Sequence, residues 1–165
     1  MVLNDVIIRP FEHGDFFRVS EIYKAGLDTG IATFETQVPS YDDWDSRFLK
    51  ICRYVAFAKN TMVGWAALSP RSKRECYRGV AETTIYIDPV FHGKGVGKKL
   101  LQHLIDESEK AGFWTLTAHI FPENTASINL HEKLGFTIVG QHQRIAQRNG
   151  KWHDNVVLEK RSKNS

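Results

Sequence analysis

The stretch that decides the fold runs from residue 84 to residue 99 and reads Thr84-Ile85-Tyr86-Ile87-Asp88-Pro89-Val90-Phe91-His92-Gly93-Lys94-Gly95-Val96-Gly97-Lys98-Lys99. Its first part is β-branched and aromatic, which is typical of a strand, and Asp88-Pro89 ends that strand. Three closely spaced glycines then open a helix that ends at Gly112. Because the first amides of a helix lack intrahelical partners and carry partial positive charge, this stretch predicts a loop that holds phosphate.

The spacing of the three glycines matches neither of two common phosphate-binding motifs. It differs from the dinucleotide pattern G-x-G-x-x-G, and no Ser or Thr follows the lysine to hold magnesium as in a P-loop. The glycines alone are therefore also compatible with a plain tight turn, and the identity of the ligand depends on other parts of the sequence.

Length and composition favour one globular domain. The chain has 165 residues, of which 42% are hydrophobic and 25% are charged, and this size is enough to bury a core. We expect a single domain over residues 1–165, with residues 161–165 as a frayed tail. The formal net charge of +3 suits an anionic ligand but is too small to indicate a nucleic-acid-binding module.

The cysteines and the first residues indicate a reducing compartment. Cys52 and Cys76 have neither a CxxC spacing nor the pattern of a disulfide framework. The first residues lack the features of a signal peptide, and no apolar run reaches membrane-spanning length. We therefore expect a cytoplasmic protein. The seven histidines show no H-x-x-x-H or H-E-x-x-H pattern, so we expect no metal site.

Hydrophobic periodicity predicts the element order β-α-α-β-β-β-α-β-α-β-β, and hence an α/β (α+β) fold with a mixed sheet covered by helices on both faces. The expected helices cover residues 15–27, 41–51, the stretch from the glycine loop to 111, and 125–134. The expected strands cover residues 6–9, 54–58, 62–68, 80–87, 116–120, 136–139 and 156–158. Residues 69–77 are expected to form a loop, and residues 141–152 a connection that contains the turn Asn149-Gly150.

Four blocks before and after the loop carry a family resemblance. They are Ala81–Ile87, Ile120–Asn124, Asn129–Phe136 and Gly150–Asp154. With the loop His-x-x-Gly-x-Gly they resemble the GNAT superfamily of N-acetyltransferases, and within it the branch of phosphinothricin and methionine sulfoximine acetyltransferases. The resemblance covers nearly the whole chain and implies a GNAT fold, whose mixed central sheet is mostly antiparallel with helices on both faces.

The resemblance implies acetyl-CoA as the co-substrate. His92 stands where the family carries Gln or Arg, the pyrophosphate is expected against the amides of the glycine loop, and the pantetheine arm along the strand before it. Asn124 is both a family contact to CoA and a good N-cap for the short helix that follows. The positions implied for acetyl-CoA binding are Ile85, Tyr86, Ile87, His92, Gly93, Lys94, Gly95, Val96, Gly97, Lys98, Asn124 and Ser127.

Two residues are expected to be catalytic by resemblance. Glu82 occupies the place of the family's proposed general base, which acts on the substrate ammonium through water; without the resemblance it reads as an exposed carboxylate. Alternation places Glu82 on the same strand face as Thr84 and Tyr86. His131 stands where many members carry a tyrosine that acts as general acid toward the CoA thiolate. Histidine exchanges protons near neutral pH, and a structural role for this residue is the alternative.

The resemblance also implies the substrate side of the site. An amino acid carries a carboxylate, which suits the planar fork of arginine. Arg71 and Arg78, with Tyr77 beside them, precede Glu82 and are the expected carboxylate partners, whereas solvated surface arginines are the alternative. Thr33 and Phe34 resemble the pair that lines the opposite wall.

The segment Trp152-His153-Asp154 is a signature of the same branch. Physical reasoning suggests Trp152 in the core and His153-Asp154 as a structural pair. Members of the branch are commonly homodimers whose C-terminal strands approach the partner's active site, so a homodimer and a place at the substrate site form the second interpretation.

The sequence therefore predicts transfer of acetyl from acetyl-CoA to the α-amine of phosphinothricin, methionine sulfoximine or methionine sulfone. One alternative keeps the fold and changes the acceptor to a polyamine, an aminoglycoside or a protein N-terminus; the basic loop between Arg71 and Arg78 opposes a cationic acceptor. Another is a CoA-binding regulatory module without turnover.

Overall fold

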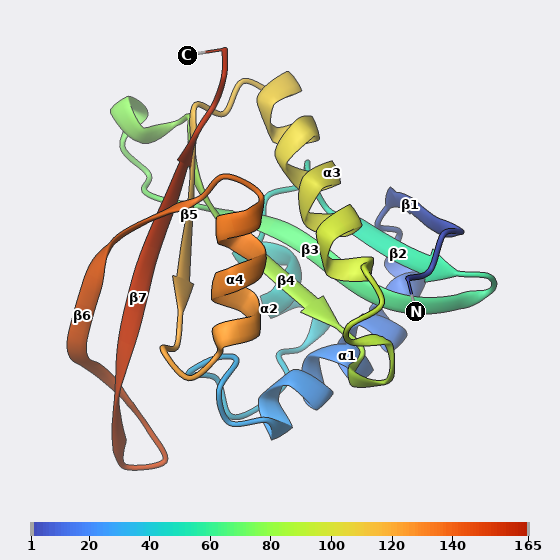
Figure 1. Ribbon diagram of the computed structural model, residues 1–165, viewed down its shortest axis with the longest axis horizontal. Helices are drawn as coiled ribbons and strands as arrows, with labels where there is room; N and C mark the ends of the chain where they lie inside the picture. The colour runs from blue at the N-terminus through green and yellow to red at the C-terminus, as the bar shows by residue number, and fades with distance from the viewer. Residues whose placement is uncertain (1, 165) are drawn as a thin grey trace.

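The computed structural model describes residues 2–164 and contains a seven-stranded sheet with the order β1-β2-β3-β4-β5-β7-β6 (Figure 1). Only β4 and β5 are parallel neighbours; every other pair is antiparallel. The expected mixed, mostly antiparallel sheet is confirmed. The strands are β1 (Val6–Pro10), β2 (Tyr54–Ala58), β3 (Thr61–Pro70), β4 (Val80–Ile87), β5 (Thr115–Ile120), β6 (Thr137–Arg148) and β7 (Lys151–Arg161).

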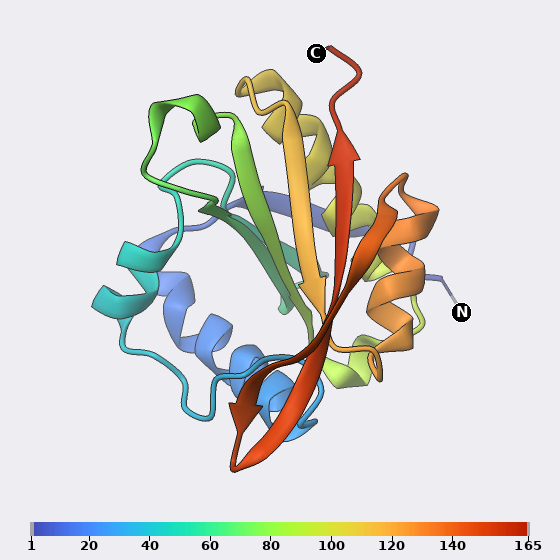
Figure 2. The same cartoon turned by 90° about the vertical axis from the view of Figure 1, so that its left-hand side faces the viewer.

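Helices cover both faces of the sheet, as Figure 2 shows. Helices α1 (Phe16–Asp28) and α2 (Tyr41–Arg47) cover one face, and α3 (Val96–Lys110) and α4 (Thr125–Lys133) cover the other. Two apolar clusters fill the layers: one joins α3 to the sheet through Leu100, Leu101 and Leu104, and the other joins α1 and α2 to it through Ile22 and Trp44. We call these the α3/α4 face and the α1/α2 face.

Strands β4 and β5 separate soon after they meet. Their parallel register covers only Val80–Glu82 against Thr115–Thr117, and the two arrows diverge in Figure 1. On the other side, β4 stays paired with β3 from Ala81 to Ile87. Within residues 2–164, no strand therefore covers this edge of the second half of β4; we call the opening between the two strands the splay.

The C-terminal hairpin is much longer than the sequence predicts. The expected strands 136–139 and 156–158 are too short, because β6 reaches Arg148 and β7 begins at Lys151. Almost every residue of β6 is exposed, so this strand has no apolar face and gives no alternating signal. The predicted turn Asn149-Gly150 is confirmed, with φ of 52° and 78°. Arg148 anchors the hairpin tip by donating from Nη2 to the Leu27 carbonyl at the end of α1, 2.9 Å away.

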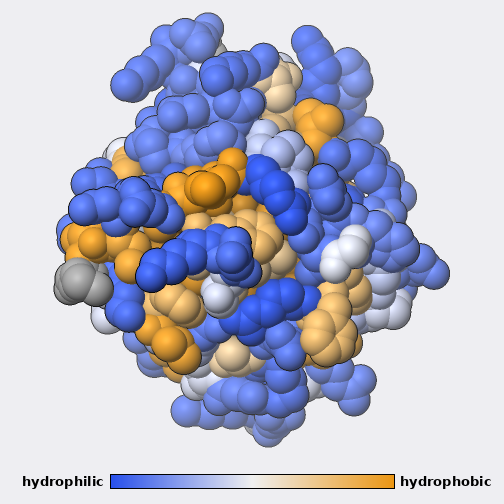
Figure 3. All heavy atoms as spheres, turned by 90° about the vertical axis from the view of Figure 1, so that its right-hand side faces the viewer, coloured by the Kyte–Doolittle hydropathy of each residue, from blue (hydrophilic) through white to orange (hydrophobic). Residues whose placement is uncertain are grey.

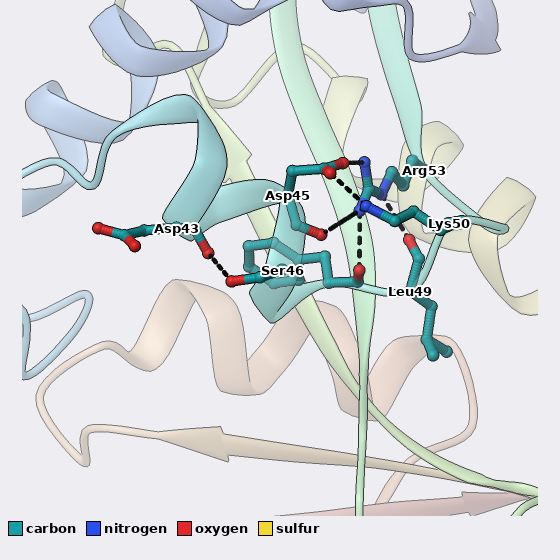
Figure 4. A network of polar contacts seen from close by, with 7 residues as sticks. Asp43, Asp45, Ser46, Leu49, Lys50 and Arg53 are labelled. Atoms are coloured by element: carbon teal, nitrogen blue, oxygen red, sulfur yellow. Dashed lines mark hydrogen bonds and ion pairs between the residues drawn. The ribbon is translucent and has the colours of Figure 1, made fainter.

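Helix α2 is shorter than predicted, and the reason is visible in Figure 4. Its start is as expected, since the Ser40 side chain accepts from the Asp43 amide at 3.2 Å. The predicted continuation to residue 51 is wrong because the backbone is extended at Phe48. The buried guanidinium of Arg53 donates hydrogen bonds to the carbonyl oxygens of Asp45 and Phe48, at 2.7 and 2.8 Å, and to the Asp45 carboxylate at 2.6 Å. A side chain thus replaces the next turn of helix.

The predicted loop over residues 69–77 contains regular structure at both ends. Strand β3 continues to Pro70, and Glu75–Tyr77 form a 3₁₀ turn, η2. Two further 3₁₀ turns, η1 (His13–Asp15) and η3 (Pro89–Phe91), precede α1 and follow β4. None of the helices within residues 2–164 has the length and apolarity to cross a membrane.

Strand β1 forms one edge of the sheet. On the face of the molecule shown in Figure 3, apolar side chains gather near the middle among hydrophilic ones. Near the start of the chain, Val2 and Ile7 are exposed. The Lys99 ammonium donates to the Leu3 and Asn4 carbonyls, and the Leu3 amide donates to the Lys94 carbonyl. The N-terminal segment is therefore fastened to the beginning of α3.

Candidate active site

The glycine loop presents a row of unused backbone donors. Among residues 2–164, the amides of Gly93–Lys98 have no hydrogen-bond partner, and the first amide to bond back into α3 is that of Lys99, to the Gly95 carbonyl at 3.2 Å. These donors stand at the N-terminus of a 15-residue helix, whose dipole adds partial positive charge. The arrangement is suited to an anion with several oxygens, such as a pyrophosphate.

Glycine serves the geometry of this loop at two positions. Gly95 is the N-cap of α3 with φ of 82°, a left-handed conformation that side chains rarely adopt. At Gly97 a Cβ atom would lie 3.2 Å from Leu130 of α4 and 3.7 Å from Ile87 of β4. The absence of side chains thus leaves the loop amides open and lets α3 approach α4 and the end of β4.

The basic side chains around the loop differ in whether other groups of the protein already engage them. His92 is exposed, but its Nε2 donates to the Ile87 carbonyl at 2.9 Å, so the ring stabilises the exit from β4. Lys94 places its ammonium 5.4 Å from the centre of the Phe91 ring, and Lys98 is exposed. A third lysine, Lys99, follows in the first turn of α3. Its ammonium is instead engaged by the carbonyls of the N-terminal segment.

Helix α4 begins as predicted. The Asn124 side-chain oxygen accepts from the Ser127 amide at 3.3 Å, which confirms the N-cap. The cap uses only the oxygen, and the Asn124 amide nitrogen has no hydrogen-bond partner among the described residues. That nitrogen remains a donor for a ligand beside β4.

Glu82 meets a residue that the sequence reading did not select. Its Oε1 contacts Nδ1 of His119, on β5. Thr83 faces α4, so alternation turns Glu82 to the α1/α2 face, where Tyr86 stacks on Tyr23 with ring centres 4.9 Å apart. Both partners of the pair keep contact with solvent, with side-chain exposures of 36% for Glu82 and 28% for His119.

His131 lies on the other face and is 2% exposed. Its Nδ1 donates to the Ser127 carbonyl at 2.7 Å, and its Nε2 lies 3.4 Å from the Thr83 hydroxyl. Burial lowers the pKa of His131, and the bond to the Ser127 carbonyl opposes that shift. The ring is therefore neutral at pH 7, with its proton on Nδ1 and a bare Nε2 that accepts.

An aromatic cluster stands on the α1/α2 face beyond the end of β5. Phe34 packs edge-on against Phe121 with ring centres 4.6 Å apart, and His153 stacks on Phe121 at 4.8 Å. Burial raises the pKa of Tyr23 and of Tyr86, and hydrogen bonds with Thr33 oppose the rise. The predicted pair of Thr33 and Phe34 thus joins β4, β5 and β7 at one place.

The signature segment of β7 divides its contacts. Trp152 is 46% exposed, beside the Arg144 guanidinium, so the interpretation of Trp152 as core is wrong. Asp154 accepts from the Arg144 amide and from Gln141, both at 2.8 Å, and these bonds lower its pKa. His153 faces the aromatic cluster instead. Neighbouring residues of a strand face opposite ways, which is why His153 and Asp154 have different partners.

The predicted arginines lie at the opposite end of β5 from the aromatic cluster. Arg78 pairs with Glu75 at 3.3 Å, stands over the Trp114 ring just before β5, and is 64% exposed. Arg71 and Tyr77 are also exposed. From Trp114 to Phe121 the chain advances roughly 20 Å at about 3.3 Å per residue. The two expected walls of the substrate site are therefore separate, with Glu82 and His119 between them.

Sequence reasoning missed His119 and Phe121. The signal was present, because in β5 the residues Leu116, Ala118 and Ile120 are apolar and buried in the α3/α4 layer. The residues between them face the α1/α2 side, where Thr117 stands opposite Glu82 in the strand register. Applying the period of two to β5, as to β4, predicts this placement.

The comparisons with known proteins agree with this geometry. Residues 20–136 match the model of the acetyltransferase (GNAT) family. The chain belongs to the GNAT acetyltransferase family. It is 30% identical over 157 residues to the L-methionine sulfoximine/L-methionine sulfone acetyltransferase of Salmonella typhimurium, covering 92% of each chain. It is also 30% identical over 153 residues to the phosphinothricin N-acetyltransferase of Streptomyces viridochromogenes, covering 90% of this chain and 84% of that one.

A solved structure shows the same architecture with a ligand. The phosphinothricin acetyltransferase of Sinorhizobium meliloti, determined in complex with acetyl-CoA, superposes on this GNAT chain with a TM-score of 0.86. The identity is 30%, over 94% of this chain and 88% of the other. The family membership makes this chain an acyltransferase. Within residues 2–164, no group of three or more His, Cys, Asp or Glu side chains is arranged to hold a metal ion.

Proposed function

We propose that this enzyme transfers acetyl from acetyl-CoA to the α-amine of a small amino acid analogue, with phosphinothricin, methionine sulfoximine and methionine sulfone as the leading acceptors. The observation that carries the proposal is the uncovered edge of β4 beside the six free amides of Gly93–Lys98. The relatives named for these acceptors support the choice of substrate.

The residues around the splay fit acetyl-CoA. The free amides of the glycine loop suit its pyrophosphate, with Lys94 and Lys98 as nearby charge, and the edge of β4 from Ile85 to Ile87 suits its pantetheine amides. The free amide nitrogen of Asn124 and the first turn of α4 at Ser127 complete that side. When bound, acetyl-CoA supplies the activated acyl group as a thioester.

Glu82 takes a proton from the acceptor ammonium, directly or through one water molecule. Only the neutral amine has the lone pair that forms the new C–N bond, and removing the proton within the site generates it. A backbone amide on the open edge of β4 polarises the acetyl carbonyl. Holding both reactants at the splay supplies much of the remaining acceleration.

We place the acceptor on the α1/α2 face beside Glu82, with its side chain toward Phe34 and Thr33 and its carboxylate toward Arg78 or Arg71, beside Tyr77. Because the two walls are roughly 20 Å apart, the exposed connection that carries the arginines has to move toward β5 for a small amino acid to contact both. The ion pair of Arg78 with Glu75 contributes little free energy, because both side chains are exposed. Arg78 is therefore free to exchange that carboxylate for a substrate's.

His131 was predicted as the proton donor to the leaving thiolate. In the structure its bare Nε2 is an acceptor facing Thr83, so a donor role requires a second proton on a ring whose burial opposes charge. We propose that His131 Nε2 accepts a hydrogen bond from the Thr83 hydroxyl and so orients that hydroxyl at the point where the splay opens.

We also propose a cytoplasmic homodimer. Both cysteines are free thiols, which suits a reducing compartment. The exposed outer strand β6 carries Ile138, Val139 and Ile145 on its surface, a feature that a second copy would cover. Light scattering coupled to size exclusion tests this: a single species of monomer mass at micromolar concentration contradicts the dimer.

Free-thiol release from acetyl-CoA tests the function. The acceptor panel holds phosphinothricin, methionine sulfoximine, methionine sulfone, ordinary amino acids, spermidine, an aminoglycoside and a short peptide. We expect release with the first three. Release only with spermidine, the aminoglycoside or the peptide keeps the fold and overturns the substrate. Binding of acetyl-CoA with no release for any amine favours the regulatory module.

A further inference from the structure

We propose that His119 positions the Glu82 carboxylate for removal of the proton from the acceptor amine. The inference rests on the proposed role of Glu82 as the base. The two residues come from different strands, β4 and β5, and their contact joins Glu82 Oε1 to His119 Nδ1 on the α1/α2 face.

The contact fixes one carboxylate oxygen and leaves the other available. A carboxylate can only accept, so the proton in this bond sits on Nδ1 of the imidazole. Among the described residues, Glu82 Oε2 has no hydrogen-bond partner. His119 therefore holds the carboxylate plane in one orientation, with Oε2 as the basic oxygen.

The pair stands where the splay opens. The register of β4 with β5 ends at Glu82 opposite Thr117, and His119 is two residues further along β5. In the described part of the chain, the Thr117 hydroxyl is buried without a partner, although it belongs to the residue directly across from Glu82. A buried hydroxyl of this kind normally binds water or a ligand, which places a polar subsite next to the basic oxygen.

The exposure of the pair argues against a purely structural role. Side chains that are 36% and 28% exposed contribute little stability as an ion pair, and neither belongs to the two apolar clusters. What the bond changes is the freedom of a long side chain at the reacting position. Fixing such a group in its reactive geometry acts on rate.

The proton step balances without any further reagent. An N–H bond of the acceptor ammonium breaks, an O–H bond forms on Glu82 Oε2, and the electron pair stays on the amine nitrogen. His119 keeps its Nδ1–H throughout and takes no proton, so it is a positioning residue.

Steady-state kinetics with the full chain and phosphinothricin tests the proposal. His119→Ala should lower kcat about tenfold and leave the KM for acetyl-CoA unchanged. His119→Asn should recover most of the loss, because its amide nitrogen replaces Nδ1. In the double variant Glu82→Gln/His119→Ala, kcat should equal that of Glu82→Gln alone, since the histidine acts through the carboxylate. His103→Ala, on α3 at the other face, is the matched control.

The possible failures are distinct. If Glu82→Gln keeps the wild-type kcat, the proposed base is wrong. If Glu82→Gln is impaired but His119→Ala matches the wild type, or the two losses multiply in the double variant, the positioning role is overturned. A change confined to the KM for acetyl-CoA also overturns it, because that result identifies the pair as a clamp on the splay. Thermal unfolding of each variant shows whether it is folded, and His119→Asn serves where His119→Ala is not.

Discussion

The two faces of the sheet treat histidine in opposite ways. His131, on the α3/α4 face, is almost completely buried, neutral and bonded to its own helix. His119, on the α1/α2 face, meets solvent and a carboxylate. The sequence predicts that Glu82 and His131 are both catalytic. Thr83, which contacts His131, follows Glu82 directly in β4, so alternation places the two side chains on different faces of the sheet. In the proposed mechanism, the residues for the acetyl donor and those for the acceptor therefore lie on opposite faces and meet at the splay.

Removing the proposed base on the α1/α2 face should have the largest effect. Glu82→Gln keeps the shape and the bond-accepting oxygen but loses the basicity, so kcat should fall about 100-fold with acetyl-CoA affinity near normal. Thiol-release kinetics and calorimetric titration with acetyl-CoA measure the two quantities. Glu132→Gln, exposed on α4, is the control. Unchanged turnover would remove Glu82 from the mechanism.

The same face depends on a buried charge for its stability. Arg53→Met leaves the carbonyls at the end of α2 without their partner and the Asp45 carboxylate with Lys50 alone, and it should lower the free energy of unfolding by about 3 kcal/mol. Urea denaturation measures this loss. Lys50→Met removes the other, exposed partner of the same carboxylate and should cost much less. Equal losses would show that the buried guanidinium is not what holds the end of α2.

The buried histidine of the opposite face should give the chain a pH-dependent stability. In the unfolded chain His131 binds a proton near pH 6.5, whereas burial lowers its pKa in the folded protein. Below about pH 6.5 the unfolded state therefore holds more protons, and the free energy of unfolding should fall as the pH falls.

Urea denaturation at pH 7.5, 6.5 and 5.5 measures this decline, and His131→Gln should flatten it. The carboxyl groups of Asp15, Asp45 and Asp154, whose pKa values are lowered, act below about pH 4 and outside this window. An equal slope in the variant would assign the decline to another group.

The smallest effect is expected at the exposed arginines. Arg78→Ala should raise the KM for the amino acid about fivefold, the value of one exposed ion pair, with kcat little changed. Arg74→Ala, from the same connection, should leave both constants alone. An effect of Arg78→Ala confined to acetyl-CoA would contradict its assignment to the acceptor.

The parts of the fold that the sequence predicts are those with a strong local signal. Strand β4 was expected with its observed bounds, and the predicted cap of Asn124 is present. The long hairpin and the early end of α2 were not, because the first has no buried face and the second depends on Arg53, which lies beyond the end of the helix. Neither cause is local to the residues whose structure it decides.

The site follows the same rule. The glycine loop is one continuous segment, so its geometry can be predicted from the local sequence. The acceptor side is assembled from α1, β4, β5, β7 and the segment before α2, and the Glu82 contact joins residues 37 positions apart. The sequence could name Glu82 through a family resemblance, but only the arrangement of the sheet brings His119 to it.

The order of the strands has a consequence for the synthesis of the chain. Strand β7 follows all the others in sequence yet is inserted between β5 and β6. While the ribosome has yet to release it, β5 has a bare edge and β6 has no partner, and bare edges recruit other chains. The glycine loop, α3 and α4 are already complete at that stage. A nascent or truncated chain that lacks β7 should therefore be prone to aggregation and unable to turn over substrate, and the acceptor side should be the last part of the enzyme to mature.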